Sequence, residues 1–136
     1  VDILRRHHQG FDDNDLAATG IAAVANGEQL DLCRREIAAV EVTDAMLDYI
    51  AGASRATREH PSVYLGASPR AAAQLLRSAK VVAAMRGRSF MTPDDVKDIA
   101  APALRHRLML RPEAEIDGLR SDDVIGEILA TIPVPR

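Results

Sequence analysis

The segment 66–70, Gly-Ala-Ser-Pro-Arg, is the part of this sequence that most clearly suggests chemistry. Ser68 is expected to be the N-cap of a helix and Pro69 its first residue, because a serine hydroxyl accepts a hydrogen bond from a free N–H and proline has no N–H to leave unbonded. Arg70 then lies in the first turn, beside about half a positive charge from the helix dipole. A guanidinium is unfavourable there by roughly 0.3–1 kcal/mol unless an anion lies nearby.

The first turn that contains Arg70 differs in charge from the first turns of three other predicted helices. Thr92 and Ser121 are each followed by two aspartates, and Thr43 is followed by Asp44. These carboxylates complement the dipole and need no catalytic role. We therefore expect the start at Ser68 to receive a phosphate or carboxylate from outside the segment. The alternative is an exposed arginine that extends into water or pairs with a distant glutamate.

Composition favours one all-α domain over residues 1–136. The chain is long enough to bury a single core, and 47% of its residues are apolar. Only 3% are aromatic and none is tryptophan, so the core must consist of alanine, leucine, isoleucine, valine and methionine. We expect a bundle of about five to six helices.

Charge and cysteine usage exclude several classes of function. Seventeen basic and twenty acidic side chains give a formal net charge of −3, so a nucleic-acid-binding surface is not expected. Cys33 has no partner for an internal disulfide, which favours a reducing cytoplasm. No apolar stretch approaches the roughly 20 residues that cross a bilayer. The chain begins at Val1 within a helical pattern, so we expect a fragment of a longer protein.

Apolar spacing and turn residues predict where the helices lie. The predicted helices are one that ends before Gly10, one from Gly27 past Ile37, and four that begin at Thr43, Pro69, Thr92 and Ser121. The predicted buried positions of the Thr43 helix are Leu47, Ile50, Ala51 and Ser54. A turn-rich connector and an alanine-rich stretch are expected over 10–27.

Two further local features are expected between residues 92 and 118. Pro102 removes a backbone donor and should kink or break the helix that begins at Thr92. Segments 106–111 and 114–118 alternate weakly and could pair as a short β-hairpin. Along the helix from Pro69, Arg70, Gln74 and Arg77 share one face at helical spacing, opposite the apolar stripe.

The residues of a complete active site are missing from the sequence. None of the eight glycines is followed by lysine, so the phosphate-binding loop G-x-x-x-x-G-K-[ST] is absent. The four histidines, His7, His8, His60 and His106, lack the spacing of a zinc site, so no metal site is expected. Cys33 is interpreted as a small buried side chain and not as a nucleophile. We expect this chain alone to hydrolyse no ATP.

Three strings closely resemble the C-terminal lid of MoxR-type AAA+ ATPases. They are VYLGASPRA at 63–71, GRSFMTPDDV at 87–96 and LRHRL at 104–108. The opening ILRRHHQGF at 3–11 and the closing IPVPR at 132–136 resemble the same family, so the likeness covers essentially the whole chain. The resemblance implies a helical lid domain whose P-loop core, which binds ATP and magnesium, lies outside this chain.

The resemblance also implies a role for Arg70. It matches the family's sensor-2 arginine, which lies at the start of a lid helix and approaches the nucleotide, and Ser68 would support it as the helix cap. The family further implies a chaperone-like ATPase that is often a hexameric ring and helps protein maturation or metal-cofactor insertion. Its implied partners are the protein's own core and neighbouring subunits; the client stays unidentified.

The sequence leaves some roles open. Arg58, Arg77 and Arg105 are further cations that could face a nucleotide or a neighbouring subunit, but an exposed or structural charge is the favoured interpretation of each. The alternative function is a helical adaptor that binds other proteins or DNA and has no nucleotide role. The net negative charge disfavours the DNA version.

Overall fold

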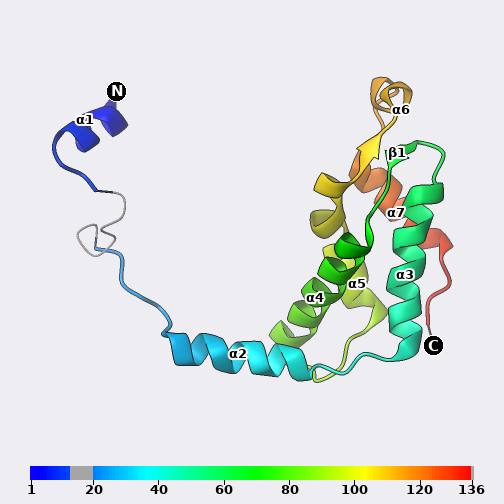
Figure 1. Ribbon diagram of the computed structural model, residues 1–136, viewed down its shortest axis with the longest axis horizontal. Coiled ribbons are helices and arrows are strands. Elements are labelled where there is room, and N and C mark those ends of the chain that lie inside the picture. Colours follow the sequence, from blue (N-terminus) through cyan, green and yellow to red (C-terminus); the bar gives the residue numbers. More distant parts are fainter. Residues whose placement is uncertain (13–19, 136) are drawn as a thin grey trace. The chain divides into compact units, whose positions relative to one another are not determined.

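The computed structural model describes residues 1–12 and 20–135 (Figure 1). The chain divides into two compact units, Val1–Arg34 and Arg35–Arg136. Part of the connector and alanine-rich stretch predicted over 10–27, namely 13–19, lies outside the described residues. That residues 1–136 form one domain stays a prediction.

The first unit contains α1, Asp2–His8, and the first part of α2, Gly27–Ala39. A reciprocal cap starts α2, because the Asn26 N–H donates to Gln29 Oε1 at 2.8 Å and the Gln29 N–H donates to Asn26 Oδ1 at 2.9 Å. None of the residues of α2 is buried. The helix from Gly27 that the sequence predicts is confirmed.

The second unit is a helical bundle with a very small sheet (Figure 1). Its helices are α3 (Asp44–Glu59), α4 (Pro69–Met85), α5 (Pro93–Leu104), the 3-10 helix η2 (Arg105–Arg107), α6 (Pro112–Ile116) and α7 (Ser121–Thr131). Its strands are β1 (Val63–Leu65) and β2 (Met109–Leu110). The prediction of an all-α fold is confirmed; the described residues contain seven α-helices, the five-residue α6 being additional to those expected.

Small side chains allow the central helices to pack closely. Along α4, Ala71, Leu75, Ala79 and Ala83 recur every fourth residue and are all 0% exposed. This stripe faces α3 and α5, and α7 also contacts α3 and α5 (Figure 1). Alanine at three of the four positions lets backbones approach, which explains how a chain with so few aromatic residues forms a dense core.

The buried face of α3 is rotated from the predicted one. Ile50 and Ser54 are buried as predicted, but Leu47 and Ala51 are exposed. The other buried residues of this helix are Met46, Tyr49, Ala53 and Thr57. The rotation buries the larger Met46 and Tyr49 against the neighbours of α3, which are α4, α5, α7 and β1. Spacing alone did not distinguish two overlapping apolar stripes.

The strands pair differently from the predicted hairpin. One strand, β2, falls in the predicted segment 106–111, but its antiparallel partner is β1, and Val63 lies opposite Leu110. Segment 114–118 forms no strand, because Pro112 has a fixed φ suited to a first helical residue and starts α6. The pairing of 106–111 with 114–118 was therefore wrong, although the short antiparallel sheet itself is present.

Pro102 does not end α5. The helix continues to Leu104, and the backbone then tightens into η2, Arg105–Arg107. Pro102 is exposed. Because proline has no N–H, the helix lacks the hydrogen bond from residue 102 to the carbonyl four residues earlier. The irregularity expected from this proline is confined to the tightening after Leu104, which leads the chain from α5 toward β2.

A complete Schellman motif ends α4. Gly87 has φ +70°, its N–H donates to the Ala84 carbonyl at 2.9 Å, and the Arg88 N–H donates to the Ala83 carbonyl at 3.0 Å. The left-handed turn at Gly87 directs the chain back toward α5. Consequently Arg86 and Arg88 both reach the first turn of that helix.

Arg86 and Arg88 both bind the carboxylate of Asp95, a residue that is 0% exposed. Arg86 Nη1 donates to it at 2.9 Å and Arg88 Nη1 at 2.7 Å, while the backbone N–H and the hydroxyl of Thr92 each donate at 2.9 Å. Burial alone would raise the pKa of Asp95, but the hydrogen bonds from Arg88 and Thr92 outweigh it and hold that pKa well below its ordinary value. Asp95 therefore both caps α5 and ties it to the end of α4.

Candidate anion-binding site

The start of α4 has the predicted geometry. Ser68 has extended backbone angles, its Oγ accepts a hydrogen bond from the Ala71 N–H at 3.2 Å, and Pro69 is the first helical residue. The first turn of α4 contains no acidic residue, whereas those of α3, α5 and α7 do. Arg70 is exposed in this turn. Its place on the helix therefore agrees with the expectation from the sequence.

Side chains of α3 hold the backbone that precedes α4. Ala67 is 0% exposed; its N–H donates to Thr57 Oγ1 at 2.8 Å, and its carbonyl accepts from Arg58 Nη1 at 2.7 Å. The Thr57 hydroxyl in turn donates to the Ser54 carbonyl at 2.7 Å. Both polar backbone groups of Ala67 are thus bound, so the position of the first turn of α4 is set by α3.

Gly66 allows this close approach of the two segments. A Cβ built on Gly66 would lie 2.6 Å from the backbone nitrogen of Arg58 and 2.7 Å from its Cα. Backbone atoms cannot move aside as the end of a flexible side chain can. Any residue larger than glycine would therefore push the segment that carries Ser68 and Arg70 away from α3.

Gly66→Ala is expected to destabilise the chain by about 1–3 kcal/mol, because the added methyl group overlaps the backbone of α3. Thermal or denaturant unfolding of the purified chain measures this. Gly126→Ala is the matched control, since Gly126 is exposed inside α7 and an added Cβ there has no atom within 4 Å. That control should stabilise by about 0.5–1 kcal/mol through helix propensity. Equal effects of the two variants would contradict the close-approach argument.

A basic cavity lies beside the first two turns of α4. It has a volume of about 470 Å³ and is lined by Arg70, Ala73, Gln74 and Arg77 of α4, and by Arg107 of η2. The four α4 residues occur at helical spacing, so the polar face predicted from the sequence forms one wall. Arg107 comes from a segment 30 or more residues away and was not singled out from the sequence.

The cationic side chains of this cavity lack counterions. Across residues 1–12 and 20–135, no carboxylate lies within ion-pair distance of Arg70, Arg77 or Arg107. Within the same ranges, the Nε of Arg107 is buried and has no hydrogen-bond partner. Like charges converging on one cavity repel one another unless an anion is bound. This arrangement therefore favours a phosphate or another multivalent anion.

The structure separates the three arginines whose roles the sequence left open. Arg58 binds the Ala67 carbonyl and so supports the backbone before α4. Arg105 forms an ion pair with Asp122 at 3.0 Å. Arg77 alone of the three lines the cavity with Arg70. Arg107 was missed because it lies in segment 106–111, which was interpreted as a strand, although the 3-10 helix η2 carries it.

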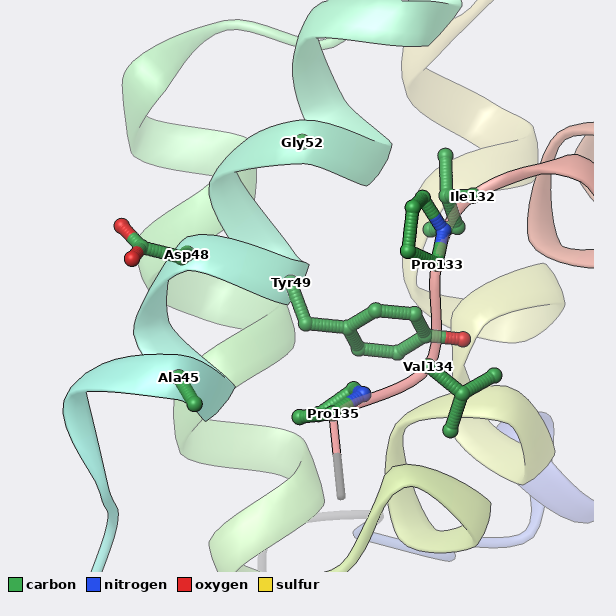
Figure 2. A pocket seen from close by; sticks show the side chains of 8 residues that line it. All are labelled: Ala45, Asp48, Tyr49, Gly52, Ile132, Pro133, Val134 and Pro135. Carbon is green, nitrogen blue, oxygen red and sulfur yellow. The ribbon is translucent and has the colours of Figure 1, made fainter.

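A second cavity, of about 360 Å³, lies between α3 and the C-terminal segment. Its lining is mainly apolar and consists of Ala45, Asp48, Tyr49, Gly52, Ile132, Pro133, Val134 and Pro135. Figure 2 shows the ring of Tyr49 pointing from α3 toward the segment that carries the two prolines. Burial, with a smaller contribution from Asp94, raises the pKa of Tyr49. This cavity lacks the convergent charges of the first.

Tyr49→Phe is expected to leave stability unchanged or to raise it by about 0.5–1 kcal/mol. Tyr49 is 4% exposed, and within the described ranges its buried hydroxyl has no hydrogen-bond partner, so folding removes the hydroxyl from water without a replacement. The midpoint of thermal unfolding is the measurement. Tyr49→Ala is the companion variant and should destabilise by about 3–5 kcal/mol through loss of packing. A marked loss of stability in Tyr49→Phe would contradict the unsatisfied hydroxyl.

Two classes of feature are not found in the part of the chain that the structure describes. No group of three or more His, Cys, Asp or Glu side chains there could hold a metal ion. No helix there has both the length and the apolar character needed to span a bilayer. Cys33, expected to be buried, is exposed on α2, because that helix buries none of its residues.

Residues 55–128 match the model of the AAA lid domain family, and the chain belongs to that family. The matched range contains α4, α5, η2 and both strands, and therefore every residue that lines the basic cavity. The MoxR-type resemblance found in the sequence is confirmed by the relatives and the solved structure that follow.

The relatives include proteins with MoxR names. The chain is 36% identical over 108 residues to the uncharacterized protein YeaC of Bacillus subtilis, a match that covers 79% of this chain and 34% of the relative. It is also 36% identical over 117 residues to the chaperone MoxR1 of Mycobacterium tuberculosis, covering 78% and 31%. The chain thus spans about a third of the length of these relatives.

A solved structure has the same fold. The crystal structure of a candidate ATPase from Cytophaga hutchinsonii superposes with a TM-score of 0.71 at 32% sequence identity. The match covers 76% of this chain and 34% of that chain. This chain is therefore a MoxR-type AAA+ lid domain, similar in sequence and fold to one part of larger proteins.

Proposed function

We propose that this lid closes over a nucleotide bound by an AAA+ core elsewhere in the full-length protein, and that Arg70 is its sensor-2 arginine. The observation that carries the proposal is the exposed guanidinium of Arg70, without an ion pair among the described residues, at the start of α4 and in a basic cavity. Membership of the AAA lid domain family supports the nucleotide as the anion.

The proposed chemistry of Arg70 is electrostatic. Charge on the terminal phosphate of ATP is stabilised by a guanidinium, which donates parallel hydrogen bonds to phosphate oxygens. Ser68 has a supporting role, because its cap determines where the helix begins and hence where Arg70 lies. Magnesium and the phosphate-binding loop would belong to the core.

The proposed contribution of the lid is motion coupled to nucleotide. ATP attracts Arg70 and draws the lid toward the core, and hydrolysis with phosphate release weakens that attraction. A lid can respond in this way only if the helix start that carries its arginine has a fixed position, and the bonds from Thr57 and Arg58 to Ala67 hold the backbone at that start.

For the full-length protein we propose a chaperone-like cytoplasmic ATPase, assembled with neighbouring subunits in a ring, which acts in protein maturation or metal-cofactor insertion. The relative named chaperone MoxR1 supports this class of protein. The unpaired cations of the basic cavity support this proposal over the alternative of a helical adaptor without a nucleotide role.

The test of the proposed function is ATP turnover by the full-length protein with and without Arg70→Ala. A strong loss of turnover with an unchanged fold is expected. Arg55→Ala is the control, because Arg55 is an exposed residue of α3 that does not line the cavity. Unchanged turnover in Arg70→Ala would remove this residue from the mechanism.

A further inference from the structure

We infer that Arg77 and Arg107 extend the site of Arg70 into a three-guanidinium cavity that holds a polyphosphate group along its length. The identity of the ligand as a nucleotide's phosphates rests on the proposed function. The cavity itself rests on geometry, since one side chain from η2 and three polar side chains from α4 line the same space.

The two elements are brought together by the fold and not by sequence proximity. β1 leads directly into the start of α4, and β2 directly follows η2, so pairing of β1 with β2 brings Arg107 beside α4. Leu104, the last residue of α5, is buried in the same core as Ala71 and Leu75. η2 is therefore held at both ends, and Arg107 has a defined position.

Arg107 differs from an ordinary surface cation. The residue is half-buried, and its Nε–H lies away from water without an acceptor anywhere in the described ranges. An anion in the cavity would reduce the repulsion among the three guanidinium groups and would accept hydrogen bonds from their exposed N–H groups.

The spacing of the cations favours a polyphosphate over a single carboxylate. Arg70 and Arg77 are two turns apart, or about 10 Å along the helix axis. One carboxylate accepts from one or two donors at a single point, whereas a polyphosphate presents oxygens along a chain. Gln74 lies between the two arginines and adds an amide donor to the same wall.

Titration of the full 136-residue chain with inorganic tripolyphosphate at low ionic strength tests this inference by backbone amide NMR. Saturable shifts are expected around α4 and η2, with affinity near the millimolar range. Arg77→Gln and Arg107→Gln should each weaken binding about three- to tenfold, and monophosphate should bind more weakly than tripolyphosphate. Arg55→Gln, which removes the same charge elsewhere, should change affinity by less than about twofold.

One lysine variant and a titration with ATP test which group and which ligand are responsible for binding. Arg107→Lys keeps the charge but loses the forked donors of the guanidinium, so it should recover only part of the lost affinity. If the ligand is the phosphate chain of a nucleotide, ATP without magnesium should shift the same residues as tripolyphosphate. If tripolyphosphate causes shifts and ATP causes none, the ligand is free polyphosphate. Thermal unfolding of each variant checks the fold.

Two results would overturn the inference. One is the absence of saturable shifts in the wild-type chain, and the other is binding by Arg77→Gln and Arg107→Gln that equals binding by Arg55→Gln. In the second case a weakened Arg70→Gln variant would still leave the proposed function in place. Conversely, full turnover by Arg70→Ala in the complete protein would remove the proposed function without affecting tripolyphosphate binding by this cavity.

Discussion

Arg70→Ala in the full-length protein is expected to lower kcat for ATP hydrolysis by about 10³-fold, the lower end of the range for arginines that stabilise transferring phosphate. This corresponds to about 4 kcal/mol of transition-state stabilisation. The side chain is exposed and outside the core, so the loss should reflect phosphate contact and not unfolding. The measurement is steady-state turnover, separated into kcat and KM.

Stability and a lysine variant distinguish this effect from a structural one. Removing a cation from the first turn of α4 should leave the unfolding free energy unchanged or raise it by about 0.3–1 kcal/mol. Arg70→Lys keeps the charge without the forked donors and should recover part of kcat. A change in KM alone would mean that Arg70 contributes equally to ground-state and transition-state binding, which contradicts the proposed role.

Asp95→Ala is expected to destabilise the folded chain by about 2–4 kcal/mol. The carboxylate accepts hydrogen bonds from Arg86, Arg88 and Thr92, so its removal disconnects the end of α4 from the start of α5 and also removes the cap of α5. The estimate lies at the lower end for buried ion pairs because both arginines can turn to water. Chemical denaturation at neutral pH measures it.

Asp94→Ala is the matched control, because Asp94 is an exposed carboxylate one residue away with a single weak pair to Lys97. It should change stability by less than about 1 kcal/mol. The Asp95→Ala effect should also depend on pH. The folded pKa of Asp95 is depressed, so its contribution is present above the ordinary carboxyl range and is lost as pH falls toward the folded pKa. A difference from wild type that stays constant from neutral pH to about pH 2 would contradict this.

The start of α4 was predictable because its signals are local. The N-cap bond joins Ser68 to Ala71, three residues apart, and Pro69 affects only its own turn. The face shared by Arg70 and Arg77 follows equally from helical spacing. The starts of α2, α3 and α5 were predictable for the same reason, since neighbouring residues form their caps.

Asp95 shows where a local interpretation was incomplete. Its role as a helix cap follows from its position three residues after Thr92. Its bonds to Arg86 and Arg88 depend on the Schellman turn at Gly87, which directs the chain back so that these side chains meet the carboxylate. The spacing of residues in the sequence does not predict that Arg86 and Arg88 approach Asp95.

The chain's residues alone thus established an all-α fold, its helix starts and the placement of Arg70, because helix formation and capping depend on interactions within a few residues; the lid domain came from the family resemblance. Long-range packing selected the buried face of α3, the partner of β2 and the position of Arg107 in the basic cavity. The pairing of β1 with β2 and the approach of Arg107 to α4 each join segments 30 or more residues apart along the chain. Such pairings are chosen by the burial of a shared core, which acts on the whole domain and leaves no periodic pattern in any one segment.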